Sequence, residues 1–283
     1  MSLRFGYGTN GFGSHRLDDA LAVIAGLGYD GVALTLDHHH LDPFDADLAT
    51  RTAKVGRRLD ELGLGVVVET GARYLLDLWR KHEPTFVSSG DRTARLELLT
   101  NAVVVAGDLG AEAVSFWSGI RPPATDDETA WARLCEGVSA VLDTAAEHGV
   151  TCAFEPEPGM FVDTLDAALE LRGRLGDPEL LKITLDLGHC VAVEDRPVAE
   201  VIGRAGSLLA NVQADDMRRG VHEHLEFGAG ELDLPAALGA LLDVDYRGLV
   251  AVELPRHGHA APVVAKRSLA ALTDALNKAK EAR

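Results

Sequence analysis

Cysteine is scarce in this sequence, which has only Cys135, Cys152 and Cys190 among its 283 residues. Their wide spacing and odd number argue against a disulfide framework and against a cysteine-rich zinc site. Long apolar runs are also missing, since none approaches the roughly 20 residues that cross a bilayer. The first residues lack the basic region, apolar core and cleavage site of a signal peptide. These absences predict a soluble protein of the reducing cytoplasm with no membrane partner.

Positive charge is in short supply as well, because 27 Lys and Arg residues face 44 Asp and Glu residues, a net charge of −17. Such a chain repels a phosphate backbone, and no basic stripe with interleaved aromatic residues offsets the acidity. A Walker loop, a Gly-rich dinucleotide fingerprint and a Gly-x-Ser-x-Gly elbow are all missing. The sequence therefore gives no support to nucleic-acid binding, phosphoryl transfer, nicotinamide chemistry or serine hydrolysis. The overall negative charge still allows a local patch of positive charge, for example at the mouth of a barrel.

What the chain does contain is a regular alternation of short apolar runs with segments of helical spacing. Strands that alternate with helices of about ten residues pair in parallel, and eight such units close a barrel more naturally than they extend an open, doubly wound sheet. We therefore predict an α/β fold, a (β/α)8 TIM barrel that forms a single domain over residues 1–283. The predicted strands are 4–9, 31–36, 64–69, 112–117, 150–155, 181–186, 208–213 and 249–253, and the predicted helices are 17–27, 45–62, 92–109, 127–148, 164–175, 197–204, 234–242 and 262–282.

Each of the last four predicted strands ends in a polar residue with an oxygen donor: Glu155, Asp186, Gln213 and Glu253. The carboxyl ends of barrel strands converge on one face, where such enzymes build their active sites. Oxygen-rich sites suit hard or borderline divalent ions, and a cation would neutralise the charge gathered at this rim. The alternative is that each residue is an ordinary strand-end side chain facing water. The joint placement of all four favours a metal site.

Several other residues are candidates for substrate contacts. His189 lies three residues after Asp186, where a short turn can return it to the site as a substrate contact or a further ligand; otherwise it is a surface or loop-capping histidine. Glu69, Arg73, Trp117 and Arg256 are plausible rim residues, and His222 and His224 follow the seventh strand. The run His38-His39-His40 resembles a nickel-binding sequence, but three successive side chains diverge, which favours a solvated loop.

The chain resembles the xylose isomerase-like TIM barrels, the superfamily of sugar phosphate isomerases and epimerases. The resemblance rests on Phe154-Glu155-Pro156-Glu157-Pro158-Gly159, Leu185-Asp186-Leu187-Gly188-His189, Asn211-Val212-Gln213-Ala214-Asp215, Gly228-Ala229-Gly230-Glu231-Leu232-Asp233 and Val252-Glu253. It implies that Glu155, Asp186, Gln213 and Glu253 bind the metal and that His189 and Arg219 contact the substrate. We also expect Glu69, Trp117 and His224 at the substrate site.

Two positions depart from the ketose epimerases of this superfamily. Gln213 stands where they carry His, although the hydroxypyruvate isomerase branch carries Gln. Phe161 stands where they place an acid six residues beyond the fifth-strand ligand, so this contact to the sugar differs from theirs. Endonuclease IV offers another overlay, in which His222 and His224 join a three-zinc cluster. That overlay fails at Trp117, which cannot ligate a cation, and near Glu69, where His is expected.

The function we predict is a divalent-metal-dependent isomerase or epimerase of a small sugar or related polyhydroxy carbonyl compound. Glu155 and Glu253 would remove and return a proton through a metal-stabilised enediolate. The metal would be Mn²⁺ or Mg²⁺, with Co²⁺, Fe²⁺ or Zn²⁺ as alternatives. A dehydratase on the same metal site is the close alternative, and a nuclease or a non-catalytic binding barrel is a more distant one. The sequence is compatible with a homo-oligomer.

Overall fold

The computed structural model describes residues 2–283 and contains a closed barrel of parallel strands. The strand order around the barrel is β1-β10-β7-β6-β5-β4-β3-β2, and β1 pairs with both β10 and β2, which closes the ring. The predicted barrel is therefore confirmed and the open sheet is excluded. The barrel strands are β1 (Arg4–Gly8), β2 (Gly31–Thr35), β3 (Gly65–Glu69), β4 (Val114–Phe116), β5 (Cys152–Phe154), β6 (Leu181–Asp186), β7 (Leu209–Ala214) and β10 (Leu249–Val252).

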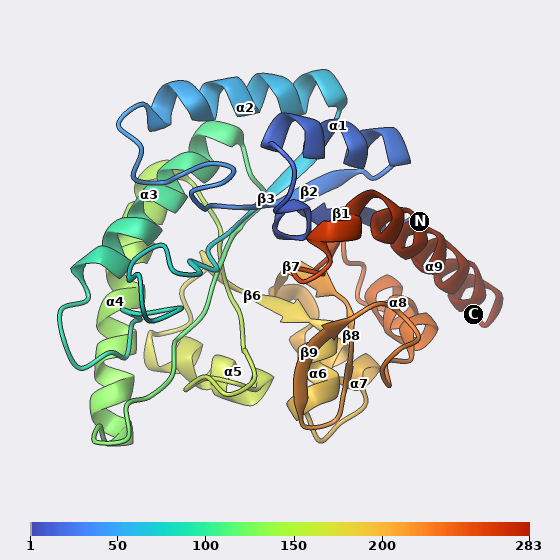
Figure 1. The fold of residues 1–283 in the computed structure, drawn as a ribbon. Helices are drawn as coiled ribbons and strands as arrows, with labels where there is room; N and C mark the ends of the chain where they lie inside the picture. The colour runs from blue at the N-terminus through green and yellow to red at the C-terminus, as the bar shows by residue number, and fades with distance from the viewer. Residues whose placement is uncertain (1) are drawn as a thin grey trace.

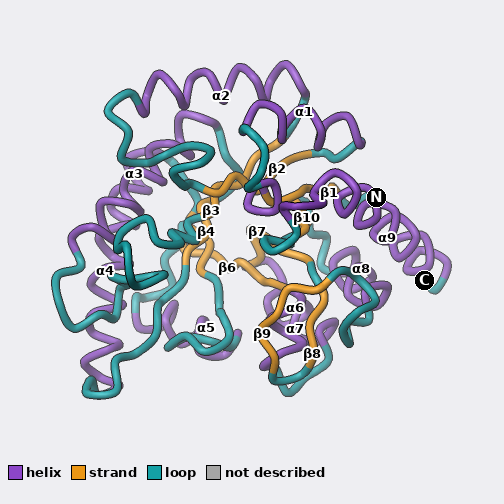
Figure 2. Tube along the Cα trace, viewed as in Figure 1, coloured by secondary structure: helices purple, strands orange, loops and turns teal. Residues whose placement is uncertain are grey.

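Helices surround the strands, which lie together at the centre of the molecule (Figures 1 and 2). Each strand is a short, almost wholly buried apolar run, as expected where side chains fill the barrel on one face and meet helices on the other. The α-helices are α1 (Leu17–Leu27), α2 (Leu48–Leu62), α3 (Thr93–Leu109), α4 (Asp127–His148), α5 (Leu165–Arg174), α6 (Leu187–Val193), α7 (Val198–Ala205), α8 (Leu234–Asp243) and α9 (Ala261–Glu281). Short 3₁₀ helices cover Thr9–Phe12, Gly206–Leu208 and Gly258–Ala260. Among residues 2–283, no helix is long and apolar enough to cross a membrane.

An α-helix and a hairpin lie where the sequence predicts only loop. The helix α6 begins directly after β6, because the side chain of Asp186 accepts a hydrogen bond from the backbone N–H of His189 at 2.8 Å and caps the first turn. A hairpin follows β7, formed by β8 (Asp216–Arg218) and β9 (Val221–Leu225). Its turn contains Gly220, whose φ of 72° is in the left-handed region. Both elements lie over the end of the barrel that holds the strand-end acids.

The strands β5 and β10 end one residue earlier than predicted, at Phe154 and Val252. Parallel pairing nevertheless reaches the acid that follows each of them. The N–H of Glu155 donates to the carbonyl of Phe116 at 2.9 Å, and the N–H of Glu253 donates to the carbonyl of Ala214 at 3.1 Å. The backbone of both acids is thus fixed by the neighbouring strand, so their side chains project from a rigid rim.

Candidate active site

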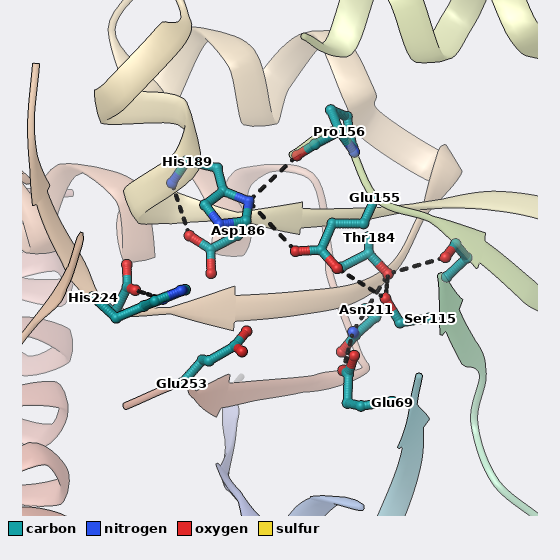
Figure 3. Close-up of polar contacts among 12 residues, drawn as sticks. Glu69, Ser115, Glu155, Pro156, Thr184, Asp186, His189, Asn211, His224 and Glu253 are labelled. Carbon is teal, nitrogen blue, oxygen red and sulfur yellow. Dashed lines mark hydrogen bonds and ion pairs between the residues drawn. The ribbon is translucent and has the colours of Figure 1, made fainter. Parts of the chain in front are cut away.

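A cavity of about 310 Å³ opens at the carboxyl ends of the barrel strands. Its volume is in the range of pockets that hold small molecules. Most of the predicted site residues line it: Glu69, Trp117, Glu155, His189, Gln213, His224 and Glu253. Asp186 is buried beside them, with 1% of its surface exposed. Figure 3 shows the carboxylates of Glu155, Asp186 and Glu253 directed toward a common space from three different strands.

Glu155, Asp186 and His189 form one group of potential metal ligands at this cavity. One ligand atom from each lies within 4.8 Å of the other two, a spacing that a single cation with bonds of roughly 2.0–2.4 Å can satisfy. The His189 Nδ1 atom lies 3.4 Å from Glu155 Oε1 and 3.3 Å from the carbonyl of Pro156. These contacts leave Nε2 as the ring atom available to a ligand.

Buried polar atoms without a partner provide a test of whether these residues suit a metal. Asp186 Oδ2, His189 Nε2 and Gln213 Oε1 are buried and have no hydrogen-bond partner among the described residues. Buried polar atoms are normally paired, because an unpaired one loses its hydration without compensation. Two oxygens and one imidazole nitrogen are ordinary ligands of divalent ions. The donor set therefore fits a cation.

The electrostatics of the cavity point the same way. Burial raises the pKa of Glu155 well above its usual range, and the neighbouring carboxylate of Glu253 raises it further. Burial also raises the pKa of Asp186, and it lowers the pKa of His189 to about 3. Without a cation, burial in this site disfavours the charged forms of Glu155, Asp186 and His189. A divalent ion would favour the charged form of the carboxylates.

Glu253 and Glu69 are held in position by two asparagines. Asn10, in the 3₁₀ turn after β1, donates its side-chain N–H to Glu253 Oε1 at 2.9 Å. Asn211, on β7, donates to Glu69 Oε1 at 3.0 Å. Burial, followed by the charge of Glu253, raises the pKa of Glu69 well above its usual range. The two acids thus face one cavity with fixed orientations.

The hairpin brings a second group of ligand-type residues to the edge of the cavity. His224 Nδ1 is in close hydrogen-bond contact with Asp215 Oδ2, and Asp215 is fully buried. The rings of His189, His222 and His224 lie 4.9 to 5.7 Å apart, centroid to centroid. Potential ligand atoms of Asp186, Asp215 and His224 also lie within 4.8 Å of one another. The acidic centre and the hairpin histidines are therefore one continuous polar network.

Trp117 and Arg219, both predicted at the substrate site, have different surroundings. Trp117 is buried beneath the guanidinium of Arg95, whose central carbon is 4.7 Å from the ring centroid. Arg219 lies on the exposed turn of the hairpin and donates to the carbonyl of Glu194 and to Asp195 at 2.6 Å. It does not line the cavity, so its role as a substrate contact remains a prediction.

Sequence reasoning missed Glu157 and the two asparagines. Glu157 lines the cavity. Phe161, which stands where the ketose epimerases carry an acid, packs edge-to-face on Trp131, with 4.9 Å between the ring centroids. Burial and the charge of Glu253 raise the pKa of Glu157 to about 8. A signal was available, because residues two apart on an extended segment share a face, which places Glu157 on the side of Glu155. Asn10 carried no comparable signal, since its contact spans 243 positions.

Comparison with known proteins agrees with the barrel fold. Residues 21–275 match the model of the xylose isomerase-like TIM barrel family. The chain belongs to this family. Among curated members, this xylose isomerase-like barrel is 25% identical over 238 residues to an L-ribulose 3-epimerase of Methylomonas sp. (strain DH-1), covering 83% of the chain and 77% of that protein. It is 27% identical over 153 residues to an inosose dehydratase of Salmonella agona (strain SL483), a match to 47% of the chain and 48% of that protein.

Solved structures show the same fold. A structure of L-ribulose 3-epimerase aligns with a TM-score of 0.79 at 20% identity, covering 99% of this xylose isomerase-like barrel and 96% of that chain. The IOLI protein, solved with a binding zinc atom, aligns with a TM-score of 0.77 at 16% identity, covering 98% of this chain and 99% of that chain. At these identities the likeness establishes the fold alone. The match to the inosose dehydratase spans about half of that protein's length.

Proposed function

We propose that this protein is a divalent-metal-dependent isomerase or epimerase of a small sugar or related polyhydroxy carbonyl compound. The observation that carries the proposal is the pair Glu155 and Glu253. The two acids follow different strands and line one cavity, together with His189 and Gln213 and beside Asp186, and each of these three residues has a buried polar atom without a hydrogen-bond partner among the described residues. A protein that only binds a sugar has no need for two carboxylates beside a cation site. The epimerase relative, aligned over most of the chain, supports the same reading.

Glu155, Asp186, Gln213 and Glu253 are the residues we assign to the metal, with His189 in place as a substrate contact or a further ligand. The oxygen-rich set favours Mn²⁺ or Mg²⁺. The nearby imidazoles of His189, His222 and His224 also suit Co²⁺, Fe²⁺ or Zn²⁺, and the structurally similar IOLI protein was solved with zinc. When bound, the ion supplies positive charge that stabilises negative charge on substrate oxygens.

The protein side chains supply the proton transfers. Glu253, oriented by Asn10, and Glu155, oriented by the backbone pairing at its N–H, would remove a proton from carbon and return it. Ser115 Oγ lies 3.4 Å from Glu155 Oε2, and it lies 2.8 Å from Thr184 Oγ1 in the barrel interior. These contacts limit the rotation of the Glu155 carboxylate. Trp117 and Glu69 would form the wall against which the substrate packs.

A dehydratase is the second candidate, favoured by the 27% identity to an inosose dehydratase. Both reactions begin with removal of a carbon-bound proton, and they differ in whether a hydroxyl group then leaves. Incubation of the metal-loaded protein with a panel of ketoses, aldoses and cyclic keto-polyols, followed by NMR of the products, separates them. An isomeric product supports the proposal, an unsaturated or deoxy product supports the dehydratase, and no conversion of any compound argues against both.

A further inference from the structure

A second cavity adjoins the first and is lined by positive charge. It has a volume of about 260 Å³ and shares Arg73, His82, Glu157 and His224 with the first cavity. Its lining adds Lys81, His222, Pro255 and Arg256. Three cationic side chains and one carboxylate thus line this space, in a chain whose net charge is −17. Like charges repel, so this concentration of cations needs an explanation.

The three cations come from two distant parts of the chain. Arg73 and Lys81 lie in the long loop between β3 and α3, and Arg256 lies in the loop after β10. Their mutual proximity is reflected at Lys81, whose pKa is lowered first by partial desolvation and then by the charge of Arg73, with a smaller contribution from Arg256. The fold therefore holds these charges together against their repulsion. That arrangement is typical of sites that bind anions.

The acids nearby only partly account for the cations. Arg73 lies 3.9 Å from Glu253 Oε1, the long limit of an ion pair, and Arg256 lies 3.3 Å from Glu223, which is itself half-exposed. Glu253 belongs to the proposed metal site, and a cation bound there would compensate its charge. The guanidinium groups offer several parallel N–H donors, a geometry that matches phosphate and carboxylate oxygens.

We propose that this second cavity, lined by Arg73, Lys81 and Arg256, binds an anionic group of the substrate, a phosphate ester or a carboxylate, while the carbonyl end lies over Glu155 and Glu253. The substrate is then an anionic sugar derivative and not a neutral sugar. This inference rests on the proposed function for the location of the reacting carbon. It goes beyond that function in naming the charge of the substrate and the residues that select it.

The test compares three ketoses that differ in one group: D-fructose, D-fructose 6-phosphate and the corresponding ketouronate. Binding of each, and of inorganic phosphate, is measured by calorimetry on the metal-loaded protein. The variants are Lys81→Gln and Arg256→Gln, both at exposed positions. The matched control is Arg80→Gln, since Arg80 is on the same loop but pairs with Asp77 at 2.7 Å. Unchanged circular dichroism and unfolding midpoints confirm that each variant is folded.

We expect at least one charged ketose to bind at least about tenfold more tightly than D-fructose. Each cavity variant should weaken the binding of that charged ketose by about tenfold. D-fructose binding and the Arg80→Gln variant should show no such loss. The identity of the tighter charged ketose then distinguishes phosphate from carboxylate. Equal affinity for all three ketoses, or equal effects of the cavity variants and the control, overturns the inference. Because the readout is binding and not product formation, the inference can hold or fail whether or not the protein isomerises any compound.

Discussion

The side chain of Asn10 donates a hydrogen bond to Oε1 of Glu253 at 2.9 Å, which joins the loop after the first barrel strand to the end of the last. Because β1 and β10 are neighbours where the barrel closes, this contact exists only in the closed fold. It leaves the second carboxylate oxygen free for the cavity. The orientation of the proposed base therefore depends on an asparagine in the 3₁₀ turn that follows the adjacent strand.

Replacing Asn10 by Ala should lower turnover by roughly tenfold to a hundredfold, the usual effect of removing a group that orients a metal ligand. The fold should persist, because the change removes one hydrogen bond at the rim. Steady-state kinetics on an identified substrate and metal analysis provide the measurement. Asn101→Ala is the matched control, since Asn101 makes a similar amide contact, to the carbonyl of Pro43, outside the cavity. Equal effects of the two variants would show that Asn10 has no special role.

Replacing Gln213 by His should preserve activity while shifting the metal preference, because imidazole is a competent ligand for the same borderline ions. The measurement is calorimetric titration of Mn²⁺, Mg²⁺, Co²⁺ and Zn²⁺ into wild type and variant. If affinities and their order are unchanged, Gln213 does not contact the ion. The site would then have to be rebuilt around His189, His222 and His224, which lie close enough together to hold one.

The stability of the metal-free protein should fall as pH rises from 6.5 to 8. The pKa of Glu157 is raised to about 8 from 4.5, mainly by burial, so in this range the folded state binds more protons than the unfolded state. Stability then decreases with pH. His189 and His222 have pKa values lowered to about 3, so their opposing effect, a loss of stability as pH falls, is confined to lower pH, below about 6.5.

Thermal unfolding with and without metal, across this pH range, measures the effect. Metal should raise the midpoint more at pH 8 than at pH 6.5, because it stabilises the ionised carboxylates. Glu157→Gln should flatten the decline in the metal-free protein. The control is Glu112→Gln, a partly exposed acid that precedes β4 at the opposite end of the barrel and pairs with Arg4 at 2.8 Å. A midpoint that rises with pH in the metal-free wild type would contradict this account.

Position 188 has room only for glycine, because the side chains of Asp215 and Met217 pack closely against it. A Cβ atom added there would lie 1.8 Å from Asp215 Oδ1 and 2.8 Å from Met217 Cγ. Gly188→Ala should therefore lower the free energy of unfolding by about 1–3 kcal/mol and weaken metal binding by displacing Asp215. Gly26→Ala is the matched control in helix α1, where nothing lies within 4 Å; it should be neutral or stabilising by about 0.5–1 kcal/mol. Chemical denaturation of both variants distinguishes a specific clash from a general effect of alanine.

The barrel was predictable because its signal is local and repeated. Each strand is a short apolar run and each helix has its own spacing, so the strand-end residues Glu155, Asp186 and Glu253 could be placed on one rim before any contact was known. The hairpin β8–β9 was missed because its first strand has three residues, too few for an alternating pattern. The Arg219-Gly220 turn was the one available signal. Asn10 and the pairing of Asp215 with His224 depend on three-dimensional proximity alone.

The central claim is that Glu253 moves a proton on carbon in a metal-dependent reaction. The direct measurement is incorporation of deuterium from heavy water into an identified substrate, followed by NMR for wild type and for Glu253→Gln, each loaded with metal or treated with a chelator. We predict that metal-loaded wild type exchanges one carbon-bound hydrogen, that chelation abolishes the exchange, and that Glu253→Gln slows it by about a hundredfold or more while some metal stays bound. Exchange at the wild-type rate in Glu253→Gln, or in the chelated protein, would contradict the account.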